Sequence, residues 1–257
     1  MDTALHGRTA VVPGSSTGLG LAVARALAAE GANVVMAARR GDVVRAEAQR
    51  LESAVGLEVD LEDPRAPRTL VEQAEQHFGP VDIVVLNSGG PVPGTATEVT
   101  DDQLVAAMHQ LLLQHQRLVA AVLPGMRERR WGRVTAIGSS GVQQPIEPLA
   151  LSNIGRAGLA AYLKSLAAEV ARDGVTVNMV LPGRISTDRV AALDRGAAER
   201  SGVTAEEARA RSEAGIPAGR YGTPEEFAAV VAFLSSPAAS YVTGEQIRCD
   251  GGMVRSF

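Results

Sequence analysis

Short apolar runs alternate along this chain with longer segments whose apolar residues recur at helical spacing. Several of the short runs are continuously rich in valine, isoleucine and leucine, as in VDIVVLN at residues 81–87. Strands need this composition when helices cover both faces of a parallel sheet. The alternation therefore predicts a single doubly wound α/β domain over residues 1–257, with a mainly parallel sheet and helices on both faces. The strands are expected at 9–13, 33–38, 56–60, 81–87, 132–140, 175–183 and 245–252, and the helices near 18–30, 42–53, 64–78, 101–129, 151–173 and 223–236.

One segment, residues 184–222, does not fit this alternation. It is rich in arginine and alanine, with glycines at positions 196, 202, 215 and 219 among others. It is too long for an ordinary connection between a strand and a helix. Because it would leave the carboxyl end of a strand, where such folds bind ligands, we expect it to be a lid over a substrate pocket.

Charge and composition argue against several classes of protein. The net charge is −4, and no basic cluster is present that could neutralise the phosphates of a nucleic acid. No apolar run reaches the roughly 18 residues of a membrane span, and the first residues lack the apolar core of a signal peptide. The lone Cys249 can form no internal disulfide, which fits a reducing compartment. We therefore expect a cytoplasmic protein with neither a nucleic-acid nor a membrane partner.

A metal site is not expected. His109 and His115 are six residues apart, whereas two histidines that share a metal on one helix face are four apart.

A glycine-rich segment, VVPGSSTGLGLAVARAL, follows the first predicted strand and opens the first predicted helix. Gly14, Gly18 and Gly20 would let the backbone approach a diphosphate, whose charge the helix N-terminus stabilises. The alternative is a glycine turn that serves only the packing of strand against helix. The order of strand, loop and helix favours dinucleotide binding.

The end of the second predicted strand should select between the two nicotinamide dinucleotides. An acidic residue there would bind the ribose 2′-hydroxyl of NAD, but Ala38 stands in that place. Arg39 and Arg40 follow and could pair with the 2′-phosphate of NADP, so NADP is favoured over NAD. Solvated surface arginines are the alternative. Asp60 and Asn87 end two further strands at the same sheet edge, where they line a binding crevice or serve as turn and cap residues.

These features occur together with NSGG at 87–90, LPGM at 123–126, IGSSG at 137–141, VNMVLPGRIST at 177–187 and VTGEQIRCDGG at 242–252. In that order they resemble the short-chain dehydrogenase/reductase superfamily, with its Rossmann-like fold, over essentially the whole chain. The resemblance implies a set of cofactor-binding residues: Gly14, Ser15, Gly18, Leu19 and Gly20 at the diphosphate, Asp60 and Leu61 at the adenine, Asn87 and Gly89 beside the adenosine ribose, and Pro182, Gly183, Ile185 and Thr187 around the nicotinamide.

The catalytic tetrad of that family is altered in this chain. Ser139 matches the family serine, but Ser152 stands at the tyrosine position and Arg156 at the lysine position. Leu111 stands at the asparagine position. A serine hydroxyl is shorter and far less acidic than a phenol, and a guanidinium stays protonated, although it can hold ribose hydroxyls or a carboxylate. The pattern is similar to a divergent branch related to 3-oxoacyl-(acyl-carrier-protein) reductases that lacks the full tetrad.

Three functions are compatible with this pattern. The first is an NADP-dependent oxidoreductase that acts on a carbonyl or alcohol, with Ser139, Ser140, a water or the substrate as proton donor. The second is a catalytically impaired dinucleotide-binding sensor or scaffold, and the third is an isomerase or dehydratase on the same fold. We favour the first.

The expected partners are a small-molecule or carrier-linked carbonyl substrate and further copies of the chain. Arg184, Arg189 and Arg220 flank the predicted lid, where they could attract an acidic substrate or simply be solvated. The helices predicted at 101–129 and 151–173 are apolar on more than one face. Members of the resembled family pack these helices against one another, which implies a homotetramer.

Overall fold

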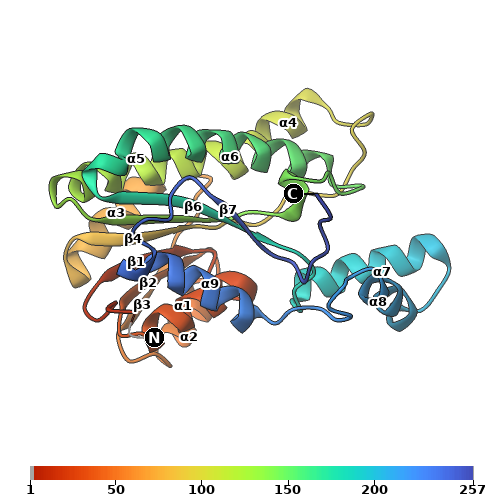
Figure 1. The fold of residues 1–257 in the computed structure, drawn as a ribbon, viewed down its shortest axis with the longest axis horizontal. Helices are drawn as coiled ribbons and strands as arrows, with labels where there is room; N and C mark the ends of the chain where they lie inside the picture. The colour runs from red at the N-terminus through yellow and green to blue at the C-terminus, as the bar shows by residue number, and fades with distance from the viewer. Residues whose placement is uncertain (1–2, 257) are drawn as a thin grey trace.

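The computed structural model describes residues 3–256. Its centre is one parallel sheet of seven strands in the order β3-β2-β1-β4-β5-β6-β7 (Figure 1). The strands are β1 (Thr9–Pro13), β2 (Asn33–Ala38), β3 (Ala54–Glu58), β4 (Val81–Leu86), β5 (Gly132–Ile137), β6 (Val175–Pro182) and β7 (Gln246–Cys249). β1, β2, β4, β5 and nearly all of β6 are buried, as helices on both faces require. The predicted doubly wound fold is confirmed.

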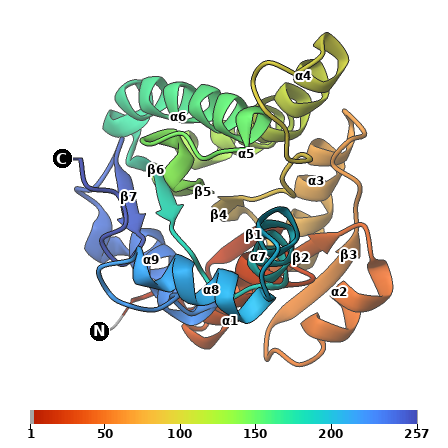
Figure 2. The same cartoon turned by 90° about the vertical axis from the view of Figure 1, so that its right-hand side faces the viewer.

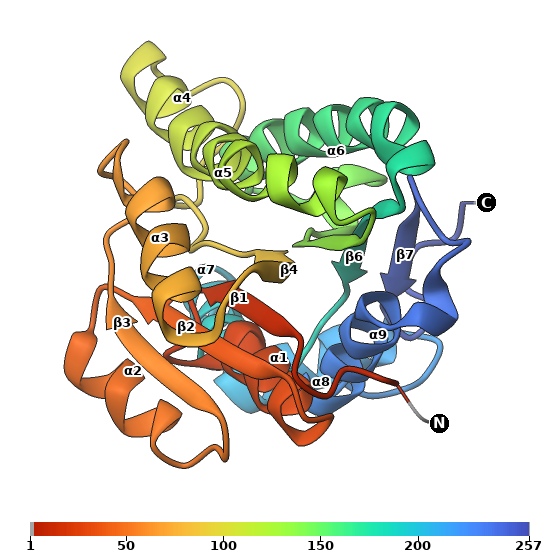
Figure 3. The same cartoon turned by 90° about the vertical axis from the view of Figure 1, so that its left-hand side faces the viewer.

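Helices form a layer on each side of the sheet (Figure 3). One layer contains α3 (Ala66–Phe78), α5 (Gln114–Glu128) and α6 (Ala150–Val170), and packs on the sheet through Leu70, Leu118 and Leu159. The other contains α1 (Gly18–Ala29), α2 (Gly41–Ala48) and α9 (Pro224–Ser235), and packs through Val23, Val44 and Phe227. Two mainly aliphatic cores therefore lie on the two faces of the sheet. In the described part of the chain no helix is long and apolar enough to cross a bilayer.

The long helix predicted at 101–129 is not continuous. It comprises α4 (Asp101–Met108), a π-helical turn (His109–Leu113) and α5. The wider turn leaves the carbonyl of Gln110 free to accept hydrogen bonds from the side chains of Ser88 and Gln114. Periodicity could not reveal the interruption, because the apolar residues continue through it. The other predicted elements match within a few residues at their ends.

The segment 184–222 is largely helical, with α7 (Asp188–Ser201) and α8 (Ala205–Ala214) set apart from the layered body (Figure 1). Thr187 caps the start of α7, and Thr204 caps α8. Asp194 anchors the segment, because its carboxylate accepts from Tyr221 Oη at 3.0 Å and pairs with Arg184 at 3.6 Å. In the view onto the right-hand side of Figure 1, α7 and α8 lie in front of the sheet (Figure 2). A lid role stays a prediction.

Candidate functional site

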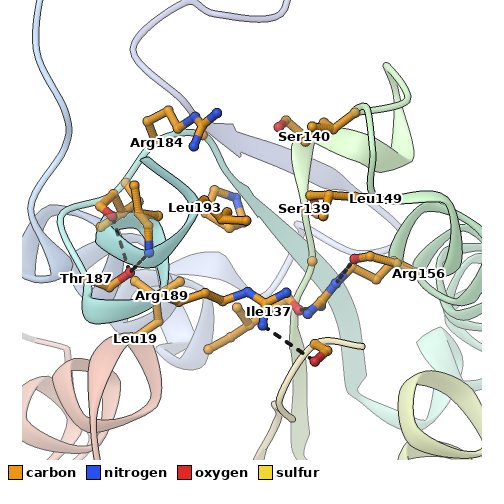
Figure 4. Close-up of a pocket in the computed structure, with 18 of the residues that line it drawn as sticks. Leu19, Ile137, Ser139, Ser140, Leu149, Arg156, Arg184, Thr187, Arg189 and Leu193 are labelled. Atoms are coloured by element: carbon orange, nitrogen blue, oxygen red, sulfur yellow. Dashed lines mark hydrogen bonds between the residues drawn. The ribbon is translucent and has the colours of Figure 1, made fainter. Parts of the chain in front are cut away.

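A cavity of about 580 Å³ opens at the carboxyl edge of the sheet, where β1, β4, β5 and β6 end. Its walls also come from the loop 144–149, the start of α6 and the start of α7. Figure 4 shows these side chains converging on one space. Thirteen of the predicted site residues line it: Gly14, Gly18, Leu19, Gly20, Asn87, Gly89, Ser139, Ser152, Arg156, Pro182, Gly183, Ile185 and Thr187.

The glycine loop forms one wall of the cavity. Gly14 and Gly18 have φ values of +61° and +60°, which residues with a side chain rarely adopt. A Cβ on Gly14 or Gly20 would lie 2.7 Å from Nδ2 of Asn87. That amide donates to the carbonyls of Pro13 and Gly14 at 3.0 and 3.2 Å, so it fixes the loop against the end of β4. The loop thus presents bare backbone and the N-terminus of α1 to the cavity, a surface that fits a diphosphate.

Four predicted cofactor residues lie outside the cavity wall: Ser15, Arg39, Asp60 and Leu61. The buried Ser15 hydroxyl donates to the carbonyl of Val12 at 2.6 Å and accepts from the amide of Ala37 at 3.1 Å, so it ties the loop to β2. Asp60 accepts from the amide of Glu62 at 3.1 Å in a local turn. Arg39 is exposed. Their contacts with a cofactor stay predictions.

Arg40, the neighbour of Arg39, makes a contact that the sequence did not single out. Its Nη2 donates to the Ser16 hydroxyl of the glycine loop at 3.3 Å. This pair joins a cation to a hydroxyl at the edge of the loop, close to the end of β2, where Ala38 itself carries no carboxylate and the neighbouring Glu58 is paired with Arg45. It could therefore hold a phosphate group.

Ser152 and Arg156 occupy one face of α6, as their spacing of four residues requires. Nε of Arg156 donates to Oγ of Ser152 at 3.4 Å, and Nη1 donates to the carbonyl of Ile137 at 2.7 Å. Burial, together with the charge of the nearby Arg189, lowers the pKa of Arg156 to about 10. The group is still a cation at neutral pH, so the floor of the cavity carries a fixed positive charge.

Leu111 packs against α6 at Gly155, the residue before Arg156, and its side chain supplies no polar group. Its side chain is 1% exposed, and a Cβ on Gly155 would lie 2.7 Å from its Cδ1. The absence of a side chain at Gly155 lets α6 approach the π-helical turn closely. The tyrosine and the lysine that α6 does contain, Tyr162 and Lys164, do not line the cavity. The Lys164 amine donates to the carbonyl of Gly244 at 2.8 Å.

Ser139 lies two residues beyond the end of β5 and faces the cavity (Figure 4). Its Oγ accepts from the amide of Gly141 at 3.1 Å, which fixes the rotamer and leaves the hydroxyl proton available to a ligand. Ser140 also lines the cavity, but it is 2% exposed. Of the two serines, Ser139 is better placed to donate to a carbonyl oxygen.

A polar pair behind the wall was missed by the sequence analysis. The Ser88 hydroxyl lines the cavity and donates to the carbonyl of Gln110 at 3.2 Å. Because a hydroxyl has one proton, its 3.3 Å contact with His115 makes Nε2 of the imidazole the donor. Nδ1 of His115 is then an unprotonated atom, and it is buried without a hydrogen-bond partner among residues 3–256. Burial, and to a lesser extent the charge of Arg156, lowers the pKa of His115 to about 3.

The three arginines predicted near the lid have different surroundings. Arg184 pairs with Asp194 at 3.6 Å, and Arg220 pairs with Glu226 at 2.6 Å and does not line the cavity. Arg189 lines the cavity and reaches the carbonyl of Gly90 at 3.5 Å. Arg184 and Arg220 are therefore held by carboxylates, and Arg189 is the one of these three whose guanidinium is available to a ligand.

Comparison with known proteins identifies the family. Residues 14–254 match the family model described as Enoyl-(Acyl carrier protein) reductase. The 3-oxoacyl-(acyl-carrier-protein) reductase FabG of Vibrio cholerae is 36% identical over 97% of this chain and 98% of its own length. A putative ketoacyl reductase of Streptomyces coelicolor is 35% identical over 95% and 96%. The structure of L-sorbose reductase from Gluconobacter frateurii, complexed with NADPH and L-sorbose, is 31% identical with a TM-score of 0.94 and covers 100% of both chains. The glycine loop, the parallel sheet and these matches together show that the chain belongs to the short-chain dehydrogenase/reductase family.

Proposed function

We propose that this chain is an NADP-dependent oxidoreductase that interconverts a carbonyl and an alcohol, with Ser139 as the group that polarises the carbonyl. One observation carries the proposal: a single cavity joins the glycine loop to Ser139, Ser152 and Arg156. The relatives named above reduce ketoacyl groups or L-sorbose, and the structure of the sorbose reductase contains NADPH.

The residues present fit a bound dinucleotide. Gly14, Gly18 and Gly20 line the cavity with bare backbone at the start of α1, where a diphosphate would lie. The absence of a Cβ at Gly14 and Gly20 lets this loop pack closely on Asn87. The Arg40 and Ser16 pair supports NADP over NAD, because both groups can bond a 2′-phosphate. Thr187 and Ile185 also line the cavity, with Thr187 close to Gly18 of the glycine loop, and the nicotinamide would lie beside them. When bound, the dinucleotide supplies the hydride.

The chain's own residues would orient the carbonyl and supply charge. Ser139 donates to the carbonyl oxygen, and Ser152 provides a second hydroxyl whose position Arg156 fixes. The cationic Arg156 stabilises negative charge that develops on that oxygen during reduction. Neither serine is acidic enough to replace a tyrosine, so the proton reaches the oxygen from a water at these hydroxyls or from the substrate. In this proposal the source of the proton differs from that of the family tetrad, while the cavity still holds the dinucleotide beside the hydroxyls that orient the carbonyl.

Association through the long helices is part of the proposal. Val105, Leu113 and Ile154 are 69%, 42% and 43% exposed, and they lie on α4, the π-helical turn and α6. These residues would be covered in a homotetramer. Light scattering coupled to gel filtration would measure the mass of the assembly, which should be four times the 26.7 kDa of one chain.

The decisive experiment separates binding from turnover. NADPH and NADH are titrated into the protein while the fluorescence of the single Trp131 is followed, and NADPH consumption is then measured with a panel of carbonyl compounds. Ser139→Ala should lower kcat by roughly 100-fold and leave NADPH affinity unchanged, since it removes one donor to the developing oxyanion. Ser165→Ala is the matched control, because that hydroxyl is exposed on α6 and bonds only within its helix.

The alternatives give different results. Tight NADPH binding without turnover, with turnover gained by the combined Leu111→Asn, Ser152→Tyr and Arg156→Lys changes, would favour a dinucleotide sensor. Turnover of a substrate without net NADPH consumption would favour an isomerase or dehydratase. Failure to bind either dinucleotide would refute the proposal.

A further inference from the structure

Two guanidinium groups approach each other inside the cavity. Arg156 extends from α6 and Arg189 from α7, and Figure 4 shows the two side chains directed toward one another near Ile137. Each is held by backbone carbonyls: Arg156 by Ile137 at 2.7 Å and Arg189 by Gly90 at 3.5 Å. Among residues 3–256, no carboxylate forms an ion pair with either of them.

The surroundings of Arg156 and Arg189 differ from those of two other arginines, Arg184 and Arg220, which have carboxylate partners. Arg184 is neutralised by Asp194, and Arg220 by Glu226. Burial lowers the pKa values of both Arg156 and Arg189, and Arg189 adds to the effect at Arg156. Arg156 is half-buried, whereas Arg189 is an exposed residue that lines the cavity, and two neighbouring cations destabilise one another. An anion between them would remove that repulsion.

The unused donors indicate what kind of anion fits. A guanidinium has five N–H groups, and Arg156 uses one at Nε and one at Nη1 within the protein. The remaining donors form the planar fork that matches a carboxylate. Ser152 lies 3.4 Å from Arg156, so a carbonyl held by the serines would lie beside an anion held by the arginine. A 2-oxo acid has its carboxylate and carbonyl on adjacent carbons.

We infer that Arg156 and Arg189 bind the carboxylate of a 2-oxo acid whose carbonyl is the group reduced, an inference that rests on the proposed function. The other source of an anion is the diphosphate of the dinucleotide. The glycine loop that fits the diphosphate follows β1, whereas the contacts of Arg156 are with Ile137 at the end of β5 and Ser152 at the start of α6. Arg189 lies nearer to that loop, because Thr187 at the start of α7 is close to Gly18. The contacts of Arg156 favour the substrate, and the variants of Arg189 distinguish the two sources.

The test compares 2-oxo-4-phenylbutanoate with its ethyl ester, which has the same ketone but no charge. The wild-type protein should prefer the acid in kcat/KM by about tenfold or more, as a charge-assisted hydrogen bond would give. Arg189→Gln should lower kcat/KM for the acid by roughly 10- to 100-fold, with little change for the ester. Arg189→Lys should restore part of the preference, because it keeps the charge and loses the fork.

Arg195→Gln is the matched control, since Arg195 is exposed on the same helix and does not line the cavity. It should behave as the wild type with both compounds. The affinity for NADPH is measured for every variant by fluorescence. If Arg189→Gln weakens NADPH binding as much as it weakens use of the acid, the guanidinium holds the diphosphate and the inference is overturned. Equal use of acid and ester by the wild type also overturns it.

A binding measurement tests the site even if neither compound is reduced. Oxamate carries a carboxylate next to an amide carbonyl that hydride does not reduce. Calorimetric titration of oxamate, with and without NADPH, should show binding by the wild type and by Arg195→Gln, and its loss in Arg189→Gln. Binding of oxamate without any carbonyl turnover would refute the proposed function and support the anion site. No binding of oxamate by the wild type would overturn the anion site.

Discussion

His115 provides a quantitative test of the polar network behind the cavity. The imidazole is 1% exposed, its Nε2 contacts Ser88, and its Nδ1 has no hydrogen-bond partner in the part of the chain that the structure describes. Burial lowers its pKa from 6.5 to about 3, with a smaller contribution from Arg156. The folded protein therefore keeps this imidazole neutral under conditions in which the unfolded chain protonates it.

The sign of the pH effect follows from proton counting. Between pH 6.5 and about 3 the unfolded state binds one more proton at this position than the folded state does. The free energy of unfolding must then rise with pH across this window and fall on acidification. The upper limit is roughly 5 kcal/mol, because each pKa unit corresponds to about 1.36 kcal/mol. Between about pH 7.5 and pH 5 the loss from this residue should be about 2 kcal/mol.

The measurement is urea unfolding of the wild type and of His115→Leu at several pH values in this range. The wild type should lose about 2 kcal/mol more than the variant on acidification, whatever the effect of the substitution near neutral pH. His77→Gln is the matched control, because His77 is exposed on α3, and it should follow the wild type. The NMR signal that disappears in His115→Leu should not titrate above about pH 4.5 in the folded wild type.

Two results would refute this reasoning. One is a loss of stability on acidification that is the same in His115→Leu and in the wild type. The other is a native-state titration of His115 near pH 6, which would mean that Nδ1 is solvated and that the polar network is open to the cavity.

Three further predictions concern the glycine loop, the cofactor preference and the end of the lid segment. Gly20→Ala should weaken NADPH binding by tenfold or more, because the new methyl group would lie 2.7 Å from Asn87 Nδ2, and fluorescence titration measures this. Arg40→Gln should weaken NADPH binding by about tenfold and leave NADH binding unchanged; equal losses for both would mean that Arg40 does not meet the 2′-phosphate. Hydrogen bonds from Arg220 and from the Thr223 amide lower the pKa of Glu226 to about 2, so Glu226 stabilises the fold above pH 4.5 and this stabilisation is lost as the pH falls toward about 2. Glu226→Gln should therefore flatten the acid side of the thermal stability profile, and an unchanged profile would contradict the assignment.

Local patterns predicted most of the fold because burial follows local periodicity. The continuous apolar runs became the buried strands β1, β2, β4, β5 and β6. The π-helical turn within 109–113 escaped prediction, because hydrogen bonds from Ser88 and Gln114 to one carbonyl decide it, and the spacing of apolar residues does not. The helices of the segment 184–222 were also missed, since that segment has few buried residues.

Some features of the candidate site could likewise be predicted from the sequence, and others could not. Amino-acid sequence alone determined the bare glycine loop after β1 and the placing of Ser152 and Arg156 on one helix face, because a turn and a helical repeat are local geometry. It could not determine which of Arg184, Arg189 and Arg220 lacks a carboxylate partner. Arg184, Arg189 and Arg220 are alike in the sequence, and only the packing of α7 and α9 gives two of them partners and turns the third toward Arg156. Arg184 and Arg220 find carboxylates ten and six residues further along the chain, whereas Arg189 contacts Gly90, 99 residues away. The path of the chain between these groups decides which of them meet, and that path belongs to the tertiary structure.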